Sequence, residues 1–230
     1  MLILALDTAG ENCAVVLATG GNGLSVHARR VEPVGRGHAE RLMPMIGEVL
    51  GEAGMTYASL ERIAVTIGPG SFTGTRIGVA AARGLALALG IPAVGVSVLD
   101  ALIEAAQGNE NGLVAAVLDA RRGEIYAKAV AASSGEIVYE AQVTTAADLA
   151  QAIAGRGGGP VTLTGSAAAD VAGMLGEADI PATIDGEAAC ADIGIVAALG
   201  MLAESGTPPV PLYLRPPDAK PQTGVTLARK

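Results

Sequence analysis

The feature that most constrains this chain is a glycine-rich stretch between a short apolar run and a long apolar segment. Residues 68–74 read Gly-Pro-Gly-Ser-Phe-Thr-Gly. The β-branched run 62–67 predicts a buried strand before it, and residues 75–89 predict a helix after it. Backbone N–H groups at such a turn and helix start bind phosphate in many proteins. The stretch lacks both the Lys-Ser/Thr of a Walker A loop and the Gly-x-Ser-x-Gly spacing of a hydrolase elbow. A tight structural turn and a phosphate cradle therefore stay equal alternatives.

The helix predicted over 75–89 is unusual in its side chains. Most of them are Gly, Ala or Leu, and the only charged ones are Arg76 and Arg83. A helix that is apolar almost all round is buried, either in its own domain or against another protein. The sequence alone leaves both alternatives open.

Composition limits the classes of function. A chain of 230 residues forms one large or two small domains. Its net charge of −8 and its 2% aromatic residues disfavour free-standing binding to nucleic acid or to an anionic membrane. Two cysteines are too few for a framework of disulfide bonds, which agrees with a protein of the reducing cytoplasm. The first residues read as a strand rather than a signal peptide, and no apolar run is long enough to span a membrane. We therefore expect a cytoplasmic protein.

The order of the predicted elements suggests a duplication. Strands 2–6, 13–18 and 24–30, helix 39–53, strand 62–67, helix 75–89 and strand 91–96 form a first unit. Strands 113–118, 125–131 and 136–142, helix 145–154, strand 161–164 and helix 167–175 partly repeat it, before a last helix at 191–203. This order predicts a two-lobed α/β fold with mixed sheets, as in the actin, sugar kinase and Hsp70 superfamily (ASKHA). We expect lobes at 1–105 and 106–215, a last helix that can cross back to the first lobe, and a flexible tail at 216–230.

Four segments resemble the bacterial TsaB (formerly YeaZ) family. They are Leu-Ala-Leu-Asp-Thr-Ala at 4–9, the glycine-rich stretch extended to Thr-Arg-Ile-Gly at 68–78, Leu-Asp-Ala-Arg-Arg-Gly-Glu-Ile-Tyr at 118–126, and Pro-Leu-Tyr-Leu-Arg at 211–215. The resemblance runs in the right order over residues 1–215. It implies the duplicated actin-like fold.

The resemblance also implies a function and partners. The family takes part in forming N6-threonylcarbamoyladenosine at the adenosine 3′ to the anticodon of tRNAs that read codons beginning with A. TsaB is similar to the catalytic subunit TsaD, pairs with it as a heterodimer, and works with the ATPase TsaE. We therefore expect a non-catalytic subunit that reaches tRNA only through the complex. Whether the chain alone forms a homodimer, and whether ATP or ADP binds at the complex interface, stay open.

The residues themselves support the loss of catalysis. TsaD-type subunits carry a His-x-x-x-His metal pair after the strand equivalent to 91–96, and here Val98 and Leu102 occupy those positions. Neither side chain can bind a metal, so we expect no metal site and no tightly bound cofactor. His27 and His38 lie elsewhere, and His38 is expected at a helix start or on the surface. Ser71 has no nearby base that would make it a nucleophile.

Two sets of binding residues are expected. The resemblance implies that the first two helices of the lobe contact TsaD, and their apolar width agrees with this, with arginines flanking the contact to pair with carboxylates. The predicted interface comprises Leu42, Met43, Met45, Ile46, Val49, Arg76, Val79, Ala82 and Arg83. A phosphate or nucleotide contact could involve Asp7, Thr8, Gly70, Ser71 and Thr73, although Glu11 would repel phosphate and Asp7 is better explained as a turn-stabilising carboxylate. The alternative function is a metal-independent small-molecule kinase or a glycoprotease-like peptidase of the same fold.

Overall fold

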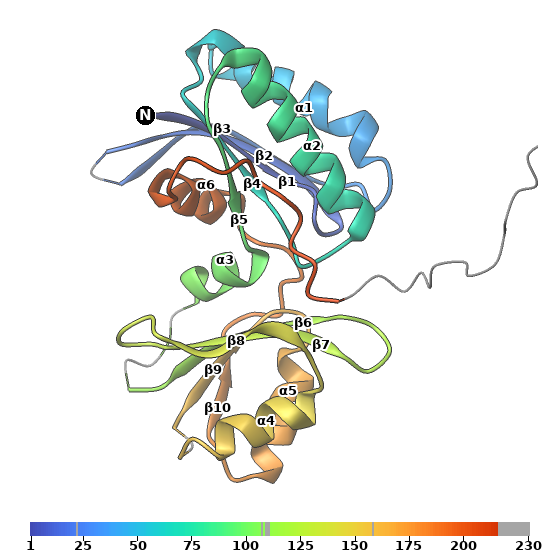
Figure 1. Ribbon diagram of the computed structural model, residues 1–230, viewed down its shortest axis with the longest axis vertical. Coiled ribbons are helices and arrows are strands. Elements are labelled where there is room, and N and C mark those ends of the chain that lie inside the picture. Colours follow the sequence, from blue (N-terminus) through green and yellow to red (C-terminus); the bar gives the residue numbers. More distant parts are fainter. Residues whose placement is uncertain (22, 107, 109–110, 158, 216–230) are drawn as a thin grey trace, which may run out of the picture.

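The chain folds into two α/β lobes, each built on a five-stranded mixed sheet (Figure 1). The computed structural model describes residues 1–21, 23–106, 108, 111–157 and 159–215. The first sheet contains β1 (Leu2–Asp7), β2 (Asn12–Gly20), β3 (Leu24–Pro33), β4 (Arg62–Thr66) and β5 (Ala93–Val96). The second contains β6 (Leu113–Asp119), β7 (Ile125–Ala131), β8 (Ile137–Thr144), β9 (Val161–Thr164) and β10 (Ala182–Ile184).

The two sheets have the same topology. The order is β3-β2-β1-β4-β5 in the first and β8-β7-β6-β9-β10 in the second. In each, the first strand pairs antiparallel with the second and parallel with the fourth. Parallel neighbours need a crossover connection, and helices provide it in both lobes. The predicted duplication and the two-lobed actin-like fold class are therefore confirmed.

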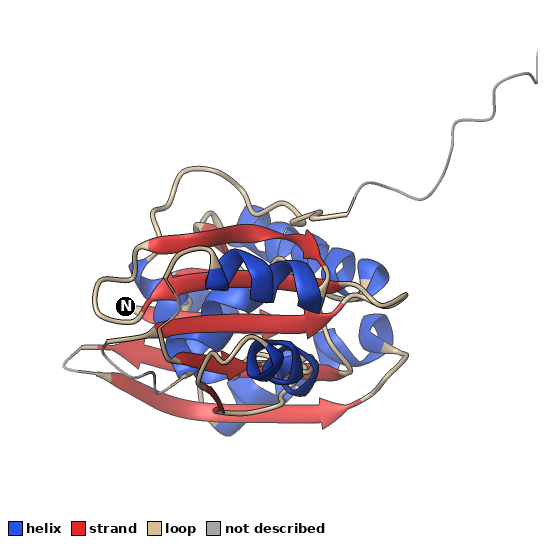
Figure 2. Ribbon diagram, turned by 90° about the horizontal axis from the view of Figure 1, so that it is seen from below, coloured by secondary structure: helices blue, strands red, loops and turns tan. Residues whose placement is uncertain are grey.

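The helices form layers on the two sheets. They are α1 (His38–Glu52), α2 (Phe72–Leu89), α3 (Val98–Ala105), α4 (Ala146–Ala154), α5 (Ala168–Glu177) and α6 (Ile193–Leu202), with a short 3₁₀ turn at Tyr57–Ser59. In the first lobe α1 and α2 lie side by side on one face of the sheet, and α6 packs on β1, β2 and β4 (Figure 1). In the second lobe α4 and α5 pack on each other, and α3 lies between the lobes (Figure 1). Figure 2 gives the view from below, in which strands run side by side across the molecule.

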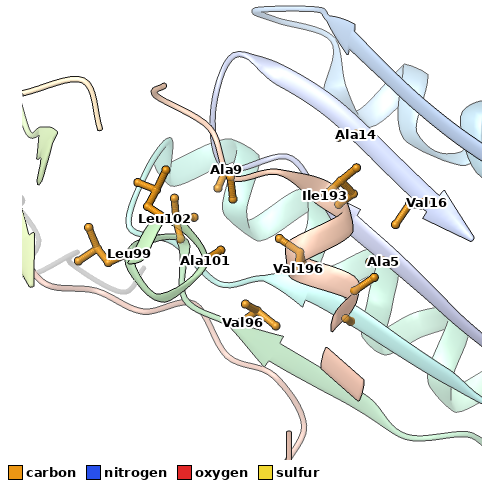
Figure 3. Close-up of a cluster of buried hydrophobic side chains, with 14 of the residues drawn as sticks. Ala5, Ala9, Ala14, Val16, Val96, Leu99, Ala101, Leu102, Ile193 and Val196 are labelled. Carbon is orange, nitrogen blue, oxygen red and sulfur yellow. The ribbon is translucent and has the colours of Figure 1, made fainter. Parts of the chain in front are cut away.

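One apolar core joins the lobes. It includes Leu99 and Leu102 of α3, Ile193 and Val196 of α6, and side chains of both sheets (Figure 3). The helix α6 approaches the first sheet closely because Gly200 has no side chain. A Cβ added at that position would lie 2.4 Å from the Cβ of Ala64. The last helix of the chain thus packs against the first lobe.

The observed elements differ from the predicted ones at several boundaries, and two of the differences have a clear physical reason. The helix α2 begins at Phe72 rather than at 75, because the Ser71 side chain caps it by accepting a hydrogen bond from the Gly74 backbone N–H. The strand β10 was not predicted, since its three residues are all exposed and carry no buried pattern. The predicted tail at 216–230 lies outside the described residues. No helix in the described part of the chain has the length and apolarity needed to cross a bilayer.

Candidate functional site

The glycine-rich stretch packs directly against the turn that follows β1. Ser71 N–H donates to the Ala9 carbonyl at 2.7 Å, and the Thr8 hydroxyl donates to the Gly74 carbonyl at 2.7 Å. A Cβ at Gly74 would lie 2.0 Å from the Thr8 carbonyl oxygen, and one at Gly70 would lie 2.3 Å from that of Ala9. The two glycines are therefore needed for close contact between backbones.

The donors at the start of α2 are largely used inside the protein. Besides Ser71 N–H, Gly74 N–H donates to the Ser71 hydroxyl at 3.2 Å and Thr75 N–H to the Ser71 carbonyl at 2.9 Å. These bonds satisfy groups that a phosphate would otherwise meet. Of the two alternatives for this stretch, the geometry favours a tight structural turn.

Asp7 is a buried carboxylate at the end of β1. Its Oδ1 accepts hydrogen bonds from the Thr66 hydroxyl at 2.5 Å and from Ala9 N–H at 2.8 Å. Burial raises the pKa of the Asp7 carboxyl above its ordinary value, while the bonds from Thr66 and Ala9 and the nearby His38 act in the opposite direction. His38 begins α1, which is one of the two positions expected for it, and its side chain is buried.

Asp7 lines a cleft of about 510 Å³ between the lobes. Glu11, Asp185 and Asp192 also line it, together with Arg29. The Arg29 guanidinium lies 2.9 Å from Asp192 Oδ2. Burial raises the pKa of the Asp192 carboxyl, but Arg29 and the first-turn N–H groups of α6 outweigh this and hold it below its ordinary value. A cleft with this excess of carboxylates repels a phosphate group.

The segments that carry the motifs meet on one side of the molecule. The segment after α6 runs along α2 and β4, where Leu212 N–H donates to the Ile67 carbonyl at 2.8 Å. Tyr213 then accepts a hydrogen bond from Arg76 of α2. Arg215 pairs with Glu124 of the turn between β6 and β7. No local sequence pattern indicates this ion pair, because it joins residues that are far apart in the chain.

Comparison with known proteins identifies the family. A family model described as TsaD, tRNA N6-adenosine threonylcarbamoyltransferase, matches residues 32–169, more than half of the chain. An uncharacterized protein of Mycobacterium tuberculosis is 36% identical over 219 residues, which cover 95% of this chain and 94% of the relative. The TsaB protein of Escherichia coli, "tRNA threonylcarbamoyladenosine biosynthesis protein TsaB", is 42% identical over 128 residues. That match covers 55% of this chain and about half of the relative's length, 53%.

The solved structures agree. YeaZ from Pseudomonas aeruginosa superposes with a TM-score of 0.68 and 30% identity, covering 87% of this chain and 91% of that one. The chain belongs to the TsaB (YeaZ) family. A hexokinase of the ROK type from Thermus thermophilus superposes with a TM-score of 0.52 at 17% identity, covering 88% of this chain and 99% of that one. At that identity it supports the fold class of this TsaB-family chain and nothing further.

Val98 and Leu102, where the resemblance to TsaD-type subunits implies a metal pair, are apolar core positions in this TsaB-family chain. Val98 and Leu102 are both 3% exposed and pack in the core between the lobes. Within the described residues, no three His, Cys, Asp or Glu side chains are grouped so as to hold a metal ion. Ser71 caps a helix, and His27 lies on β3, where its Nε2 is 3.0 Å from the Thr19 hydroxyl. Within the part of the chain that the structure describes, the hydrogen bond of the Ser71 hydroxyl is the one it accepts from Gly74 N–H, and neither a histidine nor a carboxylate bonds to it.

The predicted interface residues require a correction. Six of the nine are buried inside the lobe, at 4% exposure or less, where they pack with the first sheet: Leu42, Met45, Ile46, Val49, Val79 and Ala82. They cannot contact a partner without unfolding the lobe. Met43, Arg76 and Arg83 are exposed. The error arose because the periodic apolar positions of each helix face the sheet.

The outer faces of the two helices carry a different set of residues. On α1 the exposed positions at helical spacing include Met43, Pro44, Gly47 and Gly51. On α2 they include Ala80, Arg83, Gly84, Leu87 and Ala88, and Leu87 is 86% exposed. We call these nine residues the outer helix face. Apart from Arg83, their apolar or small character was visible in the sequence, but their exposure depended on which face the sheet covers.

Proposed function

We propose that this chain is a non-catalytic subunit of a complex that forms threonylcarbamoyladenosine in tRNA, and that it binds a TsaD-type subunit and works with a TsaE-type ATPase. Membership in the TsaB family supports the pathway. Val98 and Leu102, in the positions of the metal pair, support the loss of catalysis in this chain. The complex would act in the cytoplasm, where tRNA is modified, and this chain would reach tRNA through its partner.

The outer helix face is the observation that carries the proposal of a partner. Monomeric proteins rarely leave an apolar surface of several residues unpartnered. Gly47, Gly51 and Gly84 have no heavy atom within 4 Å of the place where a Cβ would lie. A helix of another protein can therefore approach the backbones of α1 and α2 closely. Small residues on both helices favour such a helical contact, as the resemblance implies for TsaB and TsaD.

We further propose that the chain alone holds no cofactor tightly. The acidic cleft at Asp7 and the internal use of the donors at the start of α2 both disfavour a bound nucleotide. An ATP or ADP at the junction of the subunits would then need cationic groups from the partner. Equilibrium dialysis with labelled ATP, with and without the TsaD-type subunit, tests this expectation.

The test of the partner surface uses two matched glycines. Gly84 lies on the outer helix face, and Gly173 lies on α5 in the second lobe; both are exposed helix glycines with open space around them. Replacing either by Glu improves helix propensity and causes no clash. We expect Gly84→Glu to abolish co-purification with the TsaD-type subunit and Gly173→Glu to leave it intact. Equal binding by both folded variants would contradict this surface.

The test of the function is reconstituted tRNA modification with each component omitted in turn. We expect no product without this chain and none from this chain alone. ATP hydrolysis or peptide cleavage by the purified chain alone would favour the kinase or peptidase alternative. Modification at full rate in its absence would overturn the proposed function.

A further inference from the structure

An arginine in contact with two exposed aromatic rings stands at the N-terminal end of α2. The Arg76 guanidinium carbon lies 3.5 Å from the centre of the Phe72 ring and 5.4 Å from that of Tyr213. Arg76 Nε donates a hydrogen bond to the Tyr213 hydroxyl at 2.7 Å. The two rings are 5.7 Å apart between centroids. We call Phe72, Arg76 and Tyr213 the arginine clamp.

The arginine clamp is exposed although it contains the only phenylalanine of the chain. Phe72 is 56% exposed and Tyr213 50%. In a chain with 2% aromatic residues, packing alone would place this ring in the core. Exposed Tyr and Arg together are typical of the residues that dominate binding energy at protein interfaces. The clamp therefore indicates a contact site rather than a stabilising cluster.

The guanidinium of Arg76 is held ready to bind. Stacking on Phe72 and the bond from Nε to Tyr213 fix its plane, while its two terminal nitrogens make no hydrogen bond to a carboxylate in the described residues. Arg41, by contrast, binds both Glu32 and Glu48. A fixed guanidinium whose terminal nitrogens bind no carboxylate of the described residues suits a carboxylate of another molecule, which it can bind through two parallel hydrogen bonds.

Three separate segments support the arginine clamp. Phe72 follows the Ser71 cap of α2, and the Leu212 N–H bond to Ile67 fixes the backbone beside Tyr213. The ion pair of Arg215 with Glu124 then anchors the end of the same segment on the second lobe. Because these bonds already fix the arginine clamp, its side chains lose little conformational entropy when a partner binds.

The charge around the clamp favours a partner that carries carboxylates. Residues 62–99 and 205–217 contain no Asp or Glu, although the chain has a net charge of −8. At the other end of α2, Arg83 and Leu87 line a groove of about 800 Å³ with residues 205–208. The surface formed by α2 and the segment 205–215 therefore carries apolar side chains and arginines but no carboxylate of its own. It overlaps the outer helix face at Arg83 and Leu87.

We propose that the docking surface extends from α2 onto the segment 205–215, and that Arg76 in the arginine clamp binds a carboxylate of the partner subunit. The proposal rests on the proposed function, because the partner is the TsaD-type subunit. RNA is a poorer match, since phosphate binding gains affinity from several cations together. Here Arg121 pairs with Asp119 and Arg215 with Glu124, which leaves few cations for phosphates.

The test measures the affinity of this chain for the TsaD-type subunit by calorimetry. Arg76→Glu places a like charge opposite the carboxylate, and we expect affinity to fall about 30-fold or more. Tyr213→Phe keeps the ring but removes the hydroxyl, so a loss of about 3-fold to 10-fold is expected. Arg156→Glu is the control, because it makes the same charge change at an exposed site in the second lobe. The control should change affinity by less than about twofold.

Each possible result either supports or contradicts a contact between Arg76 and a carboxylate of the partner. Restored binding between Arg76→Glu and a partner in which one carboxylate is changed to arginine would support the clamp directly. If the wild-type chain binds the TsaD-type subunit and both clamp variants bind it with the same affinity, the role of the clamp is overturned and the proposed function stands. Absence of wild-type binding would overturn both. A clamp variant that binds its partner normally, but weakens tRNA binding by the complex or self-association of the chain, would overturn the assignment to a partner carboxylate.

Discussion

Gly74 offers a quantitative test of the contact between the glycine-rich stretch and the turn after β1. In Gly74→Ala the new methyl group would lie 2.0 Å from the Thr8 carbonyl oxygen and 3.2 Å from its carbon. Both are backbone atoms, so relief requires α2 or the turn to move. The shift would also weaken the 2.7 Å hydrogen bond from the Thr8 hydroxyl to the Gly74 carbonyl.

The expected cost follows from three effects. Overpacking costs about 1–3 kcal/mol, and a weakened hydrogen bond about 0.5–1.5 kcal/mol. The higher helix propensity of alanine offsets about 0.5–1 kcal/mol of this loss of stability. We expect the free energy of unfolding to fall by about 1–3 kcal/mol, which lowers Tm by about 2–12 °C for a chain of this size.

Gly84→Ala is the matched control, because it makes the same chemical change in the same helix with nothing within 4 Å of the new methyl group. It should raise the free energy of unfolding by about 0.5–1 kcal/mol. Thermal unfolding followed by circular dichroism, with urea unfolding as a second measurement, compares the two variants. If Gly74→Ala proved as stable as Gly84→Ala, the close contact with Thr8 would be refuted.

Four further outcomes are expected. Burial raises the pKa of Asp7 above 3.8, so the folded state holds the proton of this carboxyl more tightly than the unfolded state, and the group lowers stability as pH rises through its folded pKa. Asp7→Asn should therefore melt at a higher temperature at neutral pH and lose this pH dependence, and a lower Tm at every pH would contradict it. Burial raises the pKa of Cys13 to about 11, so a thiol reagent should modify half-buried Cys190 much faster, and equal rates would argue against the buried position. Since Val98 and Leu102 cannot bind a metal, elemental analysis should find no stoichiometric zinc or iron, and one tightly held ion per chain would disprove the prediction. With a net charge of −8, the isolated chain should show no micromolar, salt-sensitive affinity for tRNA in a band-shift assay, and a shift that disappears as salt rises would count against it.

The surface of the first lobe differs in charge pairing between the side of α1 and the side of α2, and this difference affects how a partner can bind. On the side of α1, Arg41 binds Glu32 and Glu48 and holds the pKa of both carboxyls below their ordinary values. On the side of α2, Arg76 and Arg83 have no carboxylate nearby in the sequence. A partner whose carboxylates face α2 would be oriented by this difference, because unpaired like charges across an interface are costly.

The order of strands and helices was determined by the sequence, since hydrophobic periodicity and glycine positions are local properties. The duplicated lobes followed from such patterns, whereas the apolar residues in place of a metal pair were indicated only by the family resemblance. The strand β10 did not, because an exposed strand at a sheet edge carries no burial pattern. Its existence depends on pairing with β9.

The tertiary structure alone decided which residues are available for binding. Periodicity identified the apolar faces of α1 and α2 but could not say that the sheet covers them, so Met45 and Ala82 were assigned to a partner. The same limit hid the arginine clamp, because Phe72 and Tyr213 are separated by most of the chain. They meet only because α6 packs on the first sheet and leads the following segment back along α2. A local pattern determines how a segment folds, whereas long-range packing determines what that segment presents to other molecules.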